Sequence, residues 1–195
     1  MTPSDAVGVV LCGGASQRMG KDKATLELAG VAMARRTADA LREFGVGTVM
    51  TVGGDAPALA GFGDRHVDDQ HPGQGPLGGV ATAVGAARGS TLVVVACDLP
   101  DLDPELLSAL WAAGAALDDG RVVVPVAEGR EQWAVAMVPG AVAALVVDRF
   151  AAGARSLREG YGEVVRVDLG DSRSLLDLDT PEDVVRWRSR SGARE

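Results

Sequence analysis

Several features that mark particular classes of protein are scarce in this sequence. Aromatic residues make up only 4% of the 195 residues, so the core must be built mainly from Val, Leu and Ala. Two cysteines are too few for the disulfide framework of a secreted domain, and their spacing matches no zinc motif. His66 and His71 have no third ligand spaced near them, which argues against a zinc site. We therefore expect Cys12 and Cys97 to be small buried residues of a protein in a reducing compartment.

Long hydrophobic runs and an excess of positive charge are also missing. No apolar stretch reaches the length of a transmembrane helix, and the N-terminal "MTPSDAVGVV" lacks the features of a signal peptide. These absences predict a cytoplasmic protein without a membrane partner. The formal net charge of −8 argues against nucleic-acid binding, because a basic face is needed to bind a phosphate backbone. One local basic segment remains, which contains Arg18, Lys21 and Lys23.

Short apolar runs alternate with helical patterns through most of the chain. Strand patterns cover residues 7–12, 48–52, 91–96, 122–126, 133–138 and 164–169. Helical patterns cover 32–44, 79–87, 141–150 and 156–159, and two more helices begin after the N-cap signals Asp103 and Thr180. The alternation predicts an α/β fold, a Rossmann-like three-layer αβα sandwich with a mostly parallel sheet. We expect a single domain over residues 1–195, with a frayed tail at 189–195.

The loop after the first strand combines two glycines, which leave the main chain accessible, with positively charged residues. Gly13 and Gly14 lack a Cβ atom, so their N–H groups can closely approach an anion or the edge of a base. Arg18 can pair with two phosphate oxygens at once, and Lys21 and Lys23 add point charges. The spacing differs from that of a Walker P-loop. The pattern predicts a phosphate site, and the alternative is a glycine-rich turn with solvated charges.

Acidic residues follow another strand and precede the last helix. Asp98 comes directly after the strand at 91–96, at the sheet edge where ligands of α/β proteins bind. It is either a ligand of Mg²⁺, which prefers one or two carboxylates together with substrate phosphates, or a cap of the next turn. Asp179 is a candidate second metal ligand, whereas helix capping alone explains Thr180 to Asp183.

A second glycine-rich loop, "GQGPLGG", contains Gly75, Pro76 and Leu77 ahead of a predicted helix. It either embraces a flat base or sugar or forms a rigid turn. Asp68 and Asp69 lie shortly before it, and they either contact a nucleotide or are solvated. No nucleophile and base stand out as a pair, so covalent catalysis is not favoured.

Four motifs, "LCGGASQRMGKDK", "GQGPLGG", "ACDLP" and "LDTPED", occur in the order and spacing of the molybdenum cofactor guanylyltransferases. Over residues 7–187 the chain resembles this MobA-like family, which belongs to a wider class of nucleotidyltransferases with a Rossmann-like domain. The resemblance implies transfer of GMP from GTP to the terminal phosphate of molybdopterin, with Mg²⁺ as cofactor and pyrophosphate as the other product. It also implies a nucleotide-binding N-terminal part, an acceptor-binding C-terminal part, and apo-molybdoenzymes as further partners.

The resemblance assigns roles to residues that match the motifs. Lys23, Arg18 and Asp98 would be catalytic, and Asp98 would bind Mg²⁺ with Asp179 as the second candidate ligand. The GTP-binding residues would be Leu11, Cys12, Gly13, Gly14, Lys23, Gly54, Asp69, Gly75, Pro76, Leu77 and Asp98.

The choice of base depends partly on Gly13. Guanylyl members of the family tend to read L-A-G-G at this motif and cytidylyl members L-A-A-G, so Gly13 favours guanine. Three positions depart from the family pattern: Cys12 replaces an alanine, and Gly54 and Asp179 stand where asparagine is common. The alternatives are a molybdopterin cytidylyltransferase, a sugar-phosphate or small-metabolite nucleotidyltransferase, and a GTP-binding module without turnover.

Overall fold

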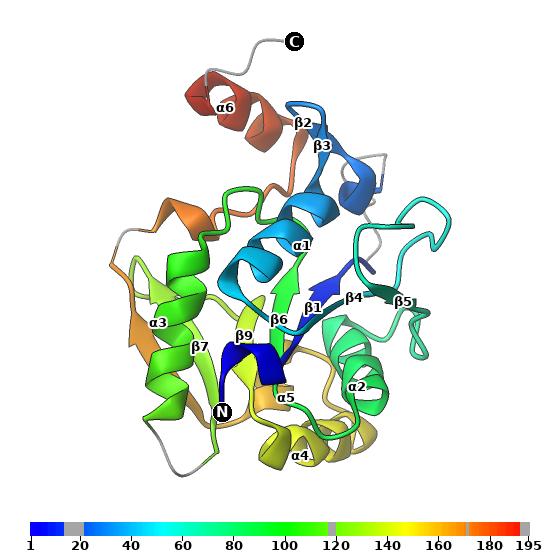
Figure 1. Cartoon of the computed structure of the whole chain (residues 1–195), viewed down its shortest axis with the longest axis vertical. Coiled ribbons are helices and arrows are strands. Elements are labelled where there is room, and N and C mark those ends of the chain that lie inside the picture. Colours follow the sequence, from blue (N-terminus) through cyan, green and yellow to red (C-terminus); the bar gives the residue numbers. More distant parts are fainter. Residues whose placement is uncertain (14–21, 117–119, 171, 192–195) are drawn as a thin grey trace.

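The structure is a computed structural model that describes residues 1–13, 22–116, 120–170 and 172–191. Gly14, Arg18 and Lys21, which the sequence places in the phosphate loop, lie outside the described residues. The described ranges contain a central sheet flanked by helices, drawn in Figure 1.

The main sheet has eight strands in the described part of the chain, in the order β10-β7-β9-β6-β1-β4-β5, with β8 paired to β7. Parallel pairing joins β1 to β4 and β6, β4 to β5, and β7 to β10, whereas β9 runs antiparallel to β6 and β7. The sheet is therefore mixed and mostly parallel, as predicted. The strands are β1 (Val7–Leu11), β4 (Thr48–Val52), β5 (Arg65–Val67), β6 (Leu92–Ala96), β7 (Val122–Ala127), β8 (Arg130–Glu131), β9 (Val135–Val138) and β10 (Val164–Asp168).

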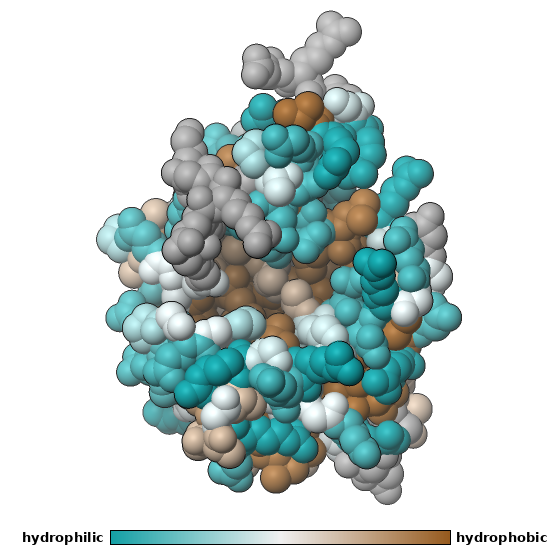
Figure 2. All heavy atoms as spheres, turned by 180° about the vertical axis from the view of Figure 1, so that it is seen from behind, coloured by the Kyte–Doolittle hydropathy of each residue, from teal (hydrophilic) through white to brown (hydrophobic). Residues whose placement is uncertain are grey.

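Helices cover both faces of this sheet, which gives the predicted three layers. One buried cluster joins the sheet to α1 (Met33–Phe44) and α3 (Pro104–Ala115). These helices lie on the near side of the sheet in Figure 1. A second cluster joins the other face to α2 (Pro76–Ala87), α4 (Gly140–Ala151) and α5 (Leu157–Tyr161). Seen from behind, the surface is hollowed, with apolar side chains on the floor and hydrophilic ones on the rim (Figure 2).

The central strands are apolar at every position because they are buried on both faces. Successive side chains of a strand point to opposite faces. On β1, Val10 belongs to the cluster with α1 and α3, whereas Val9 and Leu11 belong to the cluster with α2, α4 and α5. On β6, Val93 and Val94 are divided in the same way. A strand in a sheet that is buried on both faces therefore needs apolar residues at consecutive positions, as in these Val-rich runs.

The last helix, α6 (Pro181–Ser191), packs on a small two-stranded sheet of β2 (Glu27–Leu28) and β3 (Val31–Ala32). Figure 1 shows these elements together at one end of the molecule. The indole N–H of Trp187 donates a hydrogen bond of 2.9 Å to the Asp101 carboxylate, and the Arg36 guanidinium lies 5.2 Å from the Trp187 ring centre. These contacts attach α6 to the loop after β6 and to α1. Three short 3₁₀ helices complete the described elements: η1 (Pro3–Asp5), η2 (Lys23–Thr25) and η3 (Arg173–Leu175).

Several elements differ from the predictions. Helix α2 begins at Pro76 rather than at residue 79, because Gly75 takes the N-cap position and Pro76 the first helical one. Residues 189–191 of the predicted frayed tail belong to α6 and are helical, and residues 192–195 lie outside the described residues. Strand β5 was not predicted. No helix in the described ranges is both long enough and apolar enough to cross a bilayer.

Candidate active site

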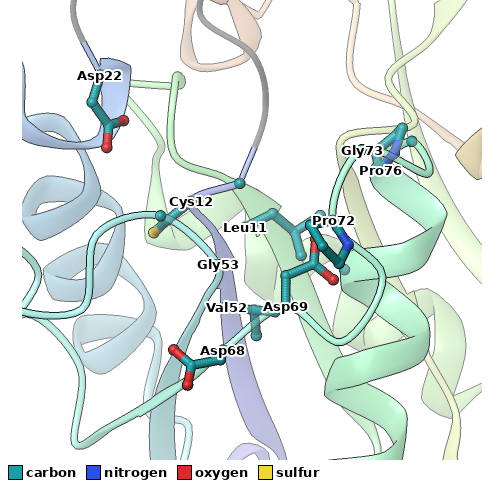
Figure 3. A pocket seen from close by; sticks show the side chains of 14 residues that line it. Leu11, Cys12, Asp22, Val52, Gly53, Asp68, Asp69, Pro72, Gly73 and Pro76 are labelled. Atoms are coloured by element: carbon teal, nitrogen blue, oxygen red, sulfur yellow. The ribbon is translucent and has the colours of Figure 1, made fainter.

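A pocket of about 810 Å³ lies beyond the C-terminal ends of β1 and β4 (Figure 3). The end of β1 and the residues after it supply one wall, and the residues after β4 and β5 supply the next. The loop that leads into α2 supplies the remaining wall. The lining residues are Leu11, Cys12, Gly13, Asp22, Val52, Gly53, Gly54, Asp68, Asp69, Pro72, Gly73, Gly75, Pro76 and Gly79.

Glycines allow the main chains after β1 and β4 to approach each other closely. A Cβ atom on Gly53 would lie 3.1 Å from the Cα of Gly13. A Cβ on Gly54 would lie 3.1 Å from the Cys12 carbonyl oxygen and 2.9 Å from Leu59, and the φ of Gly54 is +79°. Both positions therefore require glycine. Gly13 is different, since a Cβ there would meet nothing closer than 3.7 Å.

The loop before α2 is held against the connection between α4 and α5. The N–H of Leu77 donates to the Arg155 carbonyl at 3.2 Å, and a Cβ on Gly75 would lie 2.7 Å from that same oxygen. Gly75 and Pro76, which were predicted to bind GTP, line the pocket. Leu77 does not, because its side chain is fully buried in the core beneath α2 and its N–H is already bonded.

Two neighbouring aspartates reach the pocket in different ways. Asp69 is half-buried, and its Oδ1 accepts hydrogen bonds from the His71 N–H at 2.9 Å and the Thr82 hydroxyl at 3.3 Å. Its carboxylate turns toward Leu11 (Figure 3). A Cβ added to Gly13 would lie 3.7 Å from its Oδ2. Asp68 is exposed, and its Oδ1 lies 3.4 Å from Nε2 of His66. The ordered carboxylate that faces Gly13 is therefore that of Asp69.

Lys23 lies between two carboxylates from distant parts of the chain. Its Nζ is 3.1 Å from Oδ2 of Asp98 and also forms an ion pair with Asp179. The Asp22 carboxylate accepts from the Ala24 N–H at 3.0 Å and thereby fixes the short η2 helix that carries Lys23. Burial by itself lowers the pKa of Lys23. The hydrogen bonds and charges of Asp179 and Asp98 outweigh this effect, so its pKa lies above the ordinary value.

The main chain holds the two carboxylates together. The N–H of Leu178 donates to the carbonyl of Asp98 at 3.0 Å. One oxygen of Asp183 accepts from the N–H groups of Asp179 and Thr180 at 3.1 and 2.8 Å, and the Asp183 N–H donates to the Thr180 hydroxyl at 3.2 Å. This reciprocal pattern is a capping box, and it sets the position of Asp179 at the start of α6.

Asp177 adds a third negative group near the same lysine. Partial desolvation raises its pKa, and the charges of Asp179 and Asp98 raise it further. Negative charge is therefore concentrated around the Lys23 ammonium, and a second cation would be favoured here.

Asp98 and Asp179 fit a magnesium ion that is shared with a ligand. Both carboxylates contact Nζ of Lys23 from separate segments of the chain, so their oxygens lie close together, and oxygen is the ligand that Mg²⁺ prefers. Within the described ranges no group of three or more His, Cys, Asp or Glu side chains is arranged to hold a metal ion.

The two cysteines lie at the ends of the adjacent strands β1 and β6, and neither forms a disulfide. A side-chain hydrogen bond with Cys12 and burial raise the pKa of the Cys97 thiol. As predicted, both residues are buried, at 4% and 7% exposure.

The structure thus divides the predicted residues into two groups. Leu11, Cys12, Gly13, Gly54 and Asp69 line the pocket together with Gly75 and Pro76. Lys23, Asp98 and Asp179 form a separate charged cluster that does not line it.

Sequence reasoning did not single out Val52, Pro72 and Gly73 as lining residues, nor the pairing of Lys23 with Asp179. The ion pair joins residues 156 positions apart, and no local pattern signals it. The glycine pair that follows β4 did carry a signal, because consecutive glycines after an apolar strand indicate a close approach of main chain.

The fold and the site together define an α/β nucleotide-binding transferase. Two glycine loops expose main chain toward one pocket, and a lysine held by carboxylates can offset phosphate charge, as a transfer reaction on a nucleotide polyphosphate requires. Comparison with known proteins supplies the family. Residues 8–166 match the MobA-like NTP transferase domain, and the chain belongs to this family of nucleotidyltransferases.

Two curated relatives support the assignment over nearly the whole chain. A molybdenum cofactor guanylyltransferase of Cereibacter sphaeroides is 35% identical over 189 residues, which cover 93% of this chain and 95% of that protein. A probable molybdenum cofactor guanylyltransferase of Chloroflexus aggregans is 34% identical over 192 residues, with 91% and 90% coverage. The predicted family and enzyme class are thereby confirmed.

Solved structures with lower identity share the fold. Molybdopterin-guanine dinucleotide biosynthesis protein A from Archaeoglobus fulgidus has a TM-score of 0.78 at 21% identity, covering 96% of this chain and 100% of that one. The 2-C-methyl-D-erythritol 4-phosphate cytidylyltransferase from Thermus thermophilus has a TM-score of 0.65 at 18% identity, with 94% and 98% coverage. The predicted Rossmann-like class is confirmed by these likenesses.

Proposed function

We propose that this nucleotidyltransferase transfers GMP from GTP to the terminal phosphate of molybdopterin, with Mg²⁺ as cofactor and pyrophosphate as the other product. The N-terminal part of the chain would bind GTP and the C-terminal part the acceptor, and apo-molybdoenzymes would receive the product. The observation that carries the proposal is a glycine-lined pocket at the sheet edge where Lys23 pairs with Asp98 at 3.1 Å. The curated relatives are molybdenum cofactor guanylyltransferases, and this activity supplies the base and the acceptor of the proposal.

The pocket suits a nucleoside between the two glycine loops. Its volume of about 810 Å³ is in the range of small-molecule sites. Gly13 and Gly54 allow a base or ribose to approach the main chain after β1 and β4, and Gly75 and Pro76 bound the opposite wall. Oδ1 of Asp69 already accepts two hydrogen bonds. Its Oδ2 would accept from a hydroxyl or amino group of the nucleoside.

The chemistry needs positioning and charge rather than a protein nucleophile. An oxygen of the acceptor phosphate attacks the α-phosphorus of GTP, a new P–O–P bond forms, and the bond to the leaving pyrophosphate breaks. Lys23 would leave its resting ion pairs to offset the charge that builds on the pyrophosphate, and Arg18 would assist it. Asp98, with Asp179 as second carboxylate, would hold Mg²⁺, which polarises the phosphate that is attacked.

Gly13 is the residue that we expect to favour guanine. Because a Cβ at this position meets only Oδ2 of Asp69 and Gly53 at 3.7 and 3.8 Å, Gly13→Ala should fold normally. The added methyl group would occupy space on the wall of the pocket, so GTP should bind more weakly while the stability to urea is unchanged. Gly85→Ala is the matched control, since Gly85 lies in α2 and a Cβ there meets nothing within 4 Å.

The test of the function is an assay of the purified protein with Mg²⁺, molybdopterin and each nucleoside triphosphate in turn. We expect pyrophosphate release with GTP, and a product whose mass equals molybdopterin plus GMP. Release with CTP instead would make the protein a cytidylyltransferase. Turnover with sugar phosphates but not with molybdopterin would change the acceptor. Tight GTP binding without pyrophosphate release would replace the enzyme with a binding module.

A further inference from the structure

Cys12 and Cys97 are lateral neighbours on one face of the sheet. Leu11 of β1 pairs with Ala96 of β6, and each cysteine is the next residue along its strand. Main-chain hydrogen bonding between the strands continues at the two cysteines. The N–H of Cys97 donates to the Leu11 carbonyl at 3.2 Å, and the N–H of Cys12 donates to the Val52 carbonyl at 2.9 Å. Both side chains belong to the cluster on the α1 and α3 face.

This placement allows a disulfide between the two thiols. Neighbouring strands lie about 4.8 Å apart, and disulfides span Cα separations of about 4.4–6.8 Å. The Cys12 side chain raises the pKa of the Cys97 thiol, as a close neighbour does, and neither sulfur is in a disulfide. The spacing of the two strands therefore permits the bond, which forms when the two sulfurs move together.

The two cysteines differ in their position relative to the pocket. Cys12 is one of the lining residues, drawn as sticks in Figure 3, and Cys97 is not. Both side chains are buried, at 4% and 7% exposure. A small oxidant in the pocket would therefore meet Cys12 first, with Cys97 directly behind it. A reactive thiol next to a resolving thiol is the arrangement that redox-sensitive proteins use.

We propose that Cys12 and Cys97 form an oxidisable dithiol that closes to a disulfide when a hydroperoxide enters the empty nucleotide pocket. The Cys12 sulfur attacks the peroxide oxygen, the O–O bond breaks, and water (or an alcohol) leaves with formation of a Cys12 sulfenic acid. The Cys97 sulfur then attacks the Cys12 sulfur, the S–O bond breaks and a second water leaves. The two thiols lose two electrons and two protons, and the peroxide is reduced.

The disulfide would act on the enzyme through the residues that follow each cysteine. Gly13 follows Cys12 in the pocket wall, and Asp98 follows Cys97 and carries the ion pair with Lys23. The main chain of Gly54 in the pocket wall lies next to Cys12, since a Cβ added to Gly54 would lie 3.2 Å from Cβ of Cys12. Drawing the two sulfurs into a bond would move Cys12 relative to this wall. Since a misplacement of about 1 Å can cost ~100-fold in rate, we expect oxidation to inhibit turnover strongly and a thiol reductant to restore it.

The test treats the reduced full-length protein with hydrogen peroxide and reads the state of the thiols by intact mass and peptide mapping. We expect the mass to fall by two hydrogens, free thiols to fall from two to none, and one peptide pair to join Cys12 to Cys97 within a monomer. In Cys97→Ser the reaction should stop at a Cys12 sulfenic acid that dimedone traps, and basal turnover should persist. In Cys12→Ser the buried Cys97 should stay reduced.

Three results would overturn the proposal: thiols that remain free at peroxide concentrations that oxidise glutathione, disulfides formed only between molecules, or Cys97 oxidised in the Cys12→Ser variant. These readouts need no nucleotide, so they are independent of the proposed function. A separate experiment adds GTP before the peroxide and measures whether Cys12 is protected. This experiment rests on the proposed binding of GTP in the pocket. Protection of Cys12 by GTP supports occupancy of this pocket, and disulfide formation without protection would leave the dithiol intact but would place GTP elsewhere.

Discussion

Replacing Lys23 with glutamine separates its role in catalysis from its role in the fold. The substitution keeps a long polar side chain and removes the charge. Nζ of Lys23 lies 3.1 Å from Oδ2 of Asp98. At an effective dielectric constant of about 20, unit charges at this separation attract by roughly 5 kcal/mol before desolvation is counted. Asp98 and Asp179 would lose this partner together, and we expect the free energy of unfolding to fall by about 1–3 kcal/mol.

The effect on rate should be larger than the effect on binding. Charge on the leaving pyrophosphate builds in the transition state, so a cation that offsets it acts on kcat more than on KM. Loss of one such group costs ~100- to 1000-fold in turnover, or about 2.7–4 kcal/mol. The measurement is single-turnover release of pyrophosphate at saturating GTP, with GTP affinity measured separately by calorimetry.

The control for Lys23→Gln is Arg166→Gln. Arg166 is exposed and pairs with Glu131 at 3.0 Å on the edge strand β10, away from both glycine loops. This variant should lose an exposed ion pair and keep its turnover. If Lys23→Gln turns over like the wild type, Lys23 has no part in the chemistry. If both kcat and GTP affinity fall equally, its role is ground-state binding.

Three further outcomes follow from the site. Asp98→Asn should keep its fold and should need a much higher Mg²⁺ concentration for activity; an unchanged Mg²⁺ titration would remove it as a ligand. Gly54→Ala should unfold at lower urea, because its φ is +79° and a Cβ would lie 2.9 Å from Leu59; wild-type stability would contradict this geometry. The hydrogen bond from Thr180 lowers the pKa of Asp183 to about 2, against an ordinary value of 3.8. Its carboxylate therefore stabilises α6 fully above pH 3.8 and progressively less as the pH falls toward 2. Asp183→Ala should lower the stability by about 1 kcal/mol at pH 7, as loss of a helix cap does. Urea unfolding at pH 7 and at pH 2.5 should show this difference shrinking in acid, and an equal difference at both would refute the capping role.

The features that the sequence predicted correctly depend on local chemistry. The Val-rich runs of β1 and β6 are apolar at consecutive positions, which only a sheet buried on both faces accommodates. Asp103 caps α3 by accepting from the Glu105 N–H at 2.9 Å, as its position before Pro104 indicated. The glycines after β1 and ahead of α2 marked the two loops that now border one pocket.

Other features depend on neighbours that are remote in the sequence. The three residues of β5 include a charged and a titratable side chain, and they form a strand only because β4 offers its free edge. Leu77 lies within a predicted binding motif, yet the packing of α2 on the core buries it. In a sequence, an apolar side chain next to a glycine loop is compatible both with contacting a ligand and with packing in the core. The packing of the helix decides between these two roles.

By itself, the sequence determined the class of fold, the two glycine loops and the family, because hydrophobic period, capping residues and motif spacing are all properties of short segments. Only the tertiary structure decided that Lys23 is held by both Asp98 and Asp179, that Asp69 rather than Asp68 presents its carboxylate to Gly13, and that the two cysteines are lateral neighbours on adjacent strands. These contacts arise where strands and loops that are distant in the chain meet at one edge of the sheet. The energy of such contacts depends on distances in space, which no local pattern of residues records.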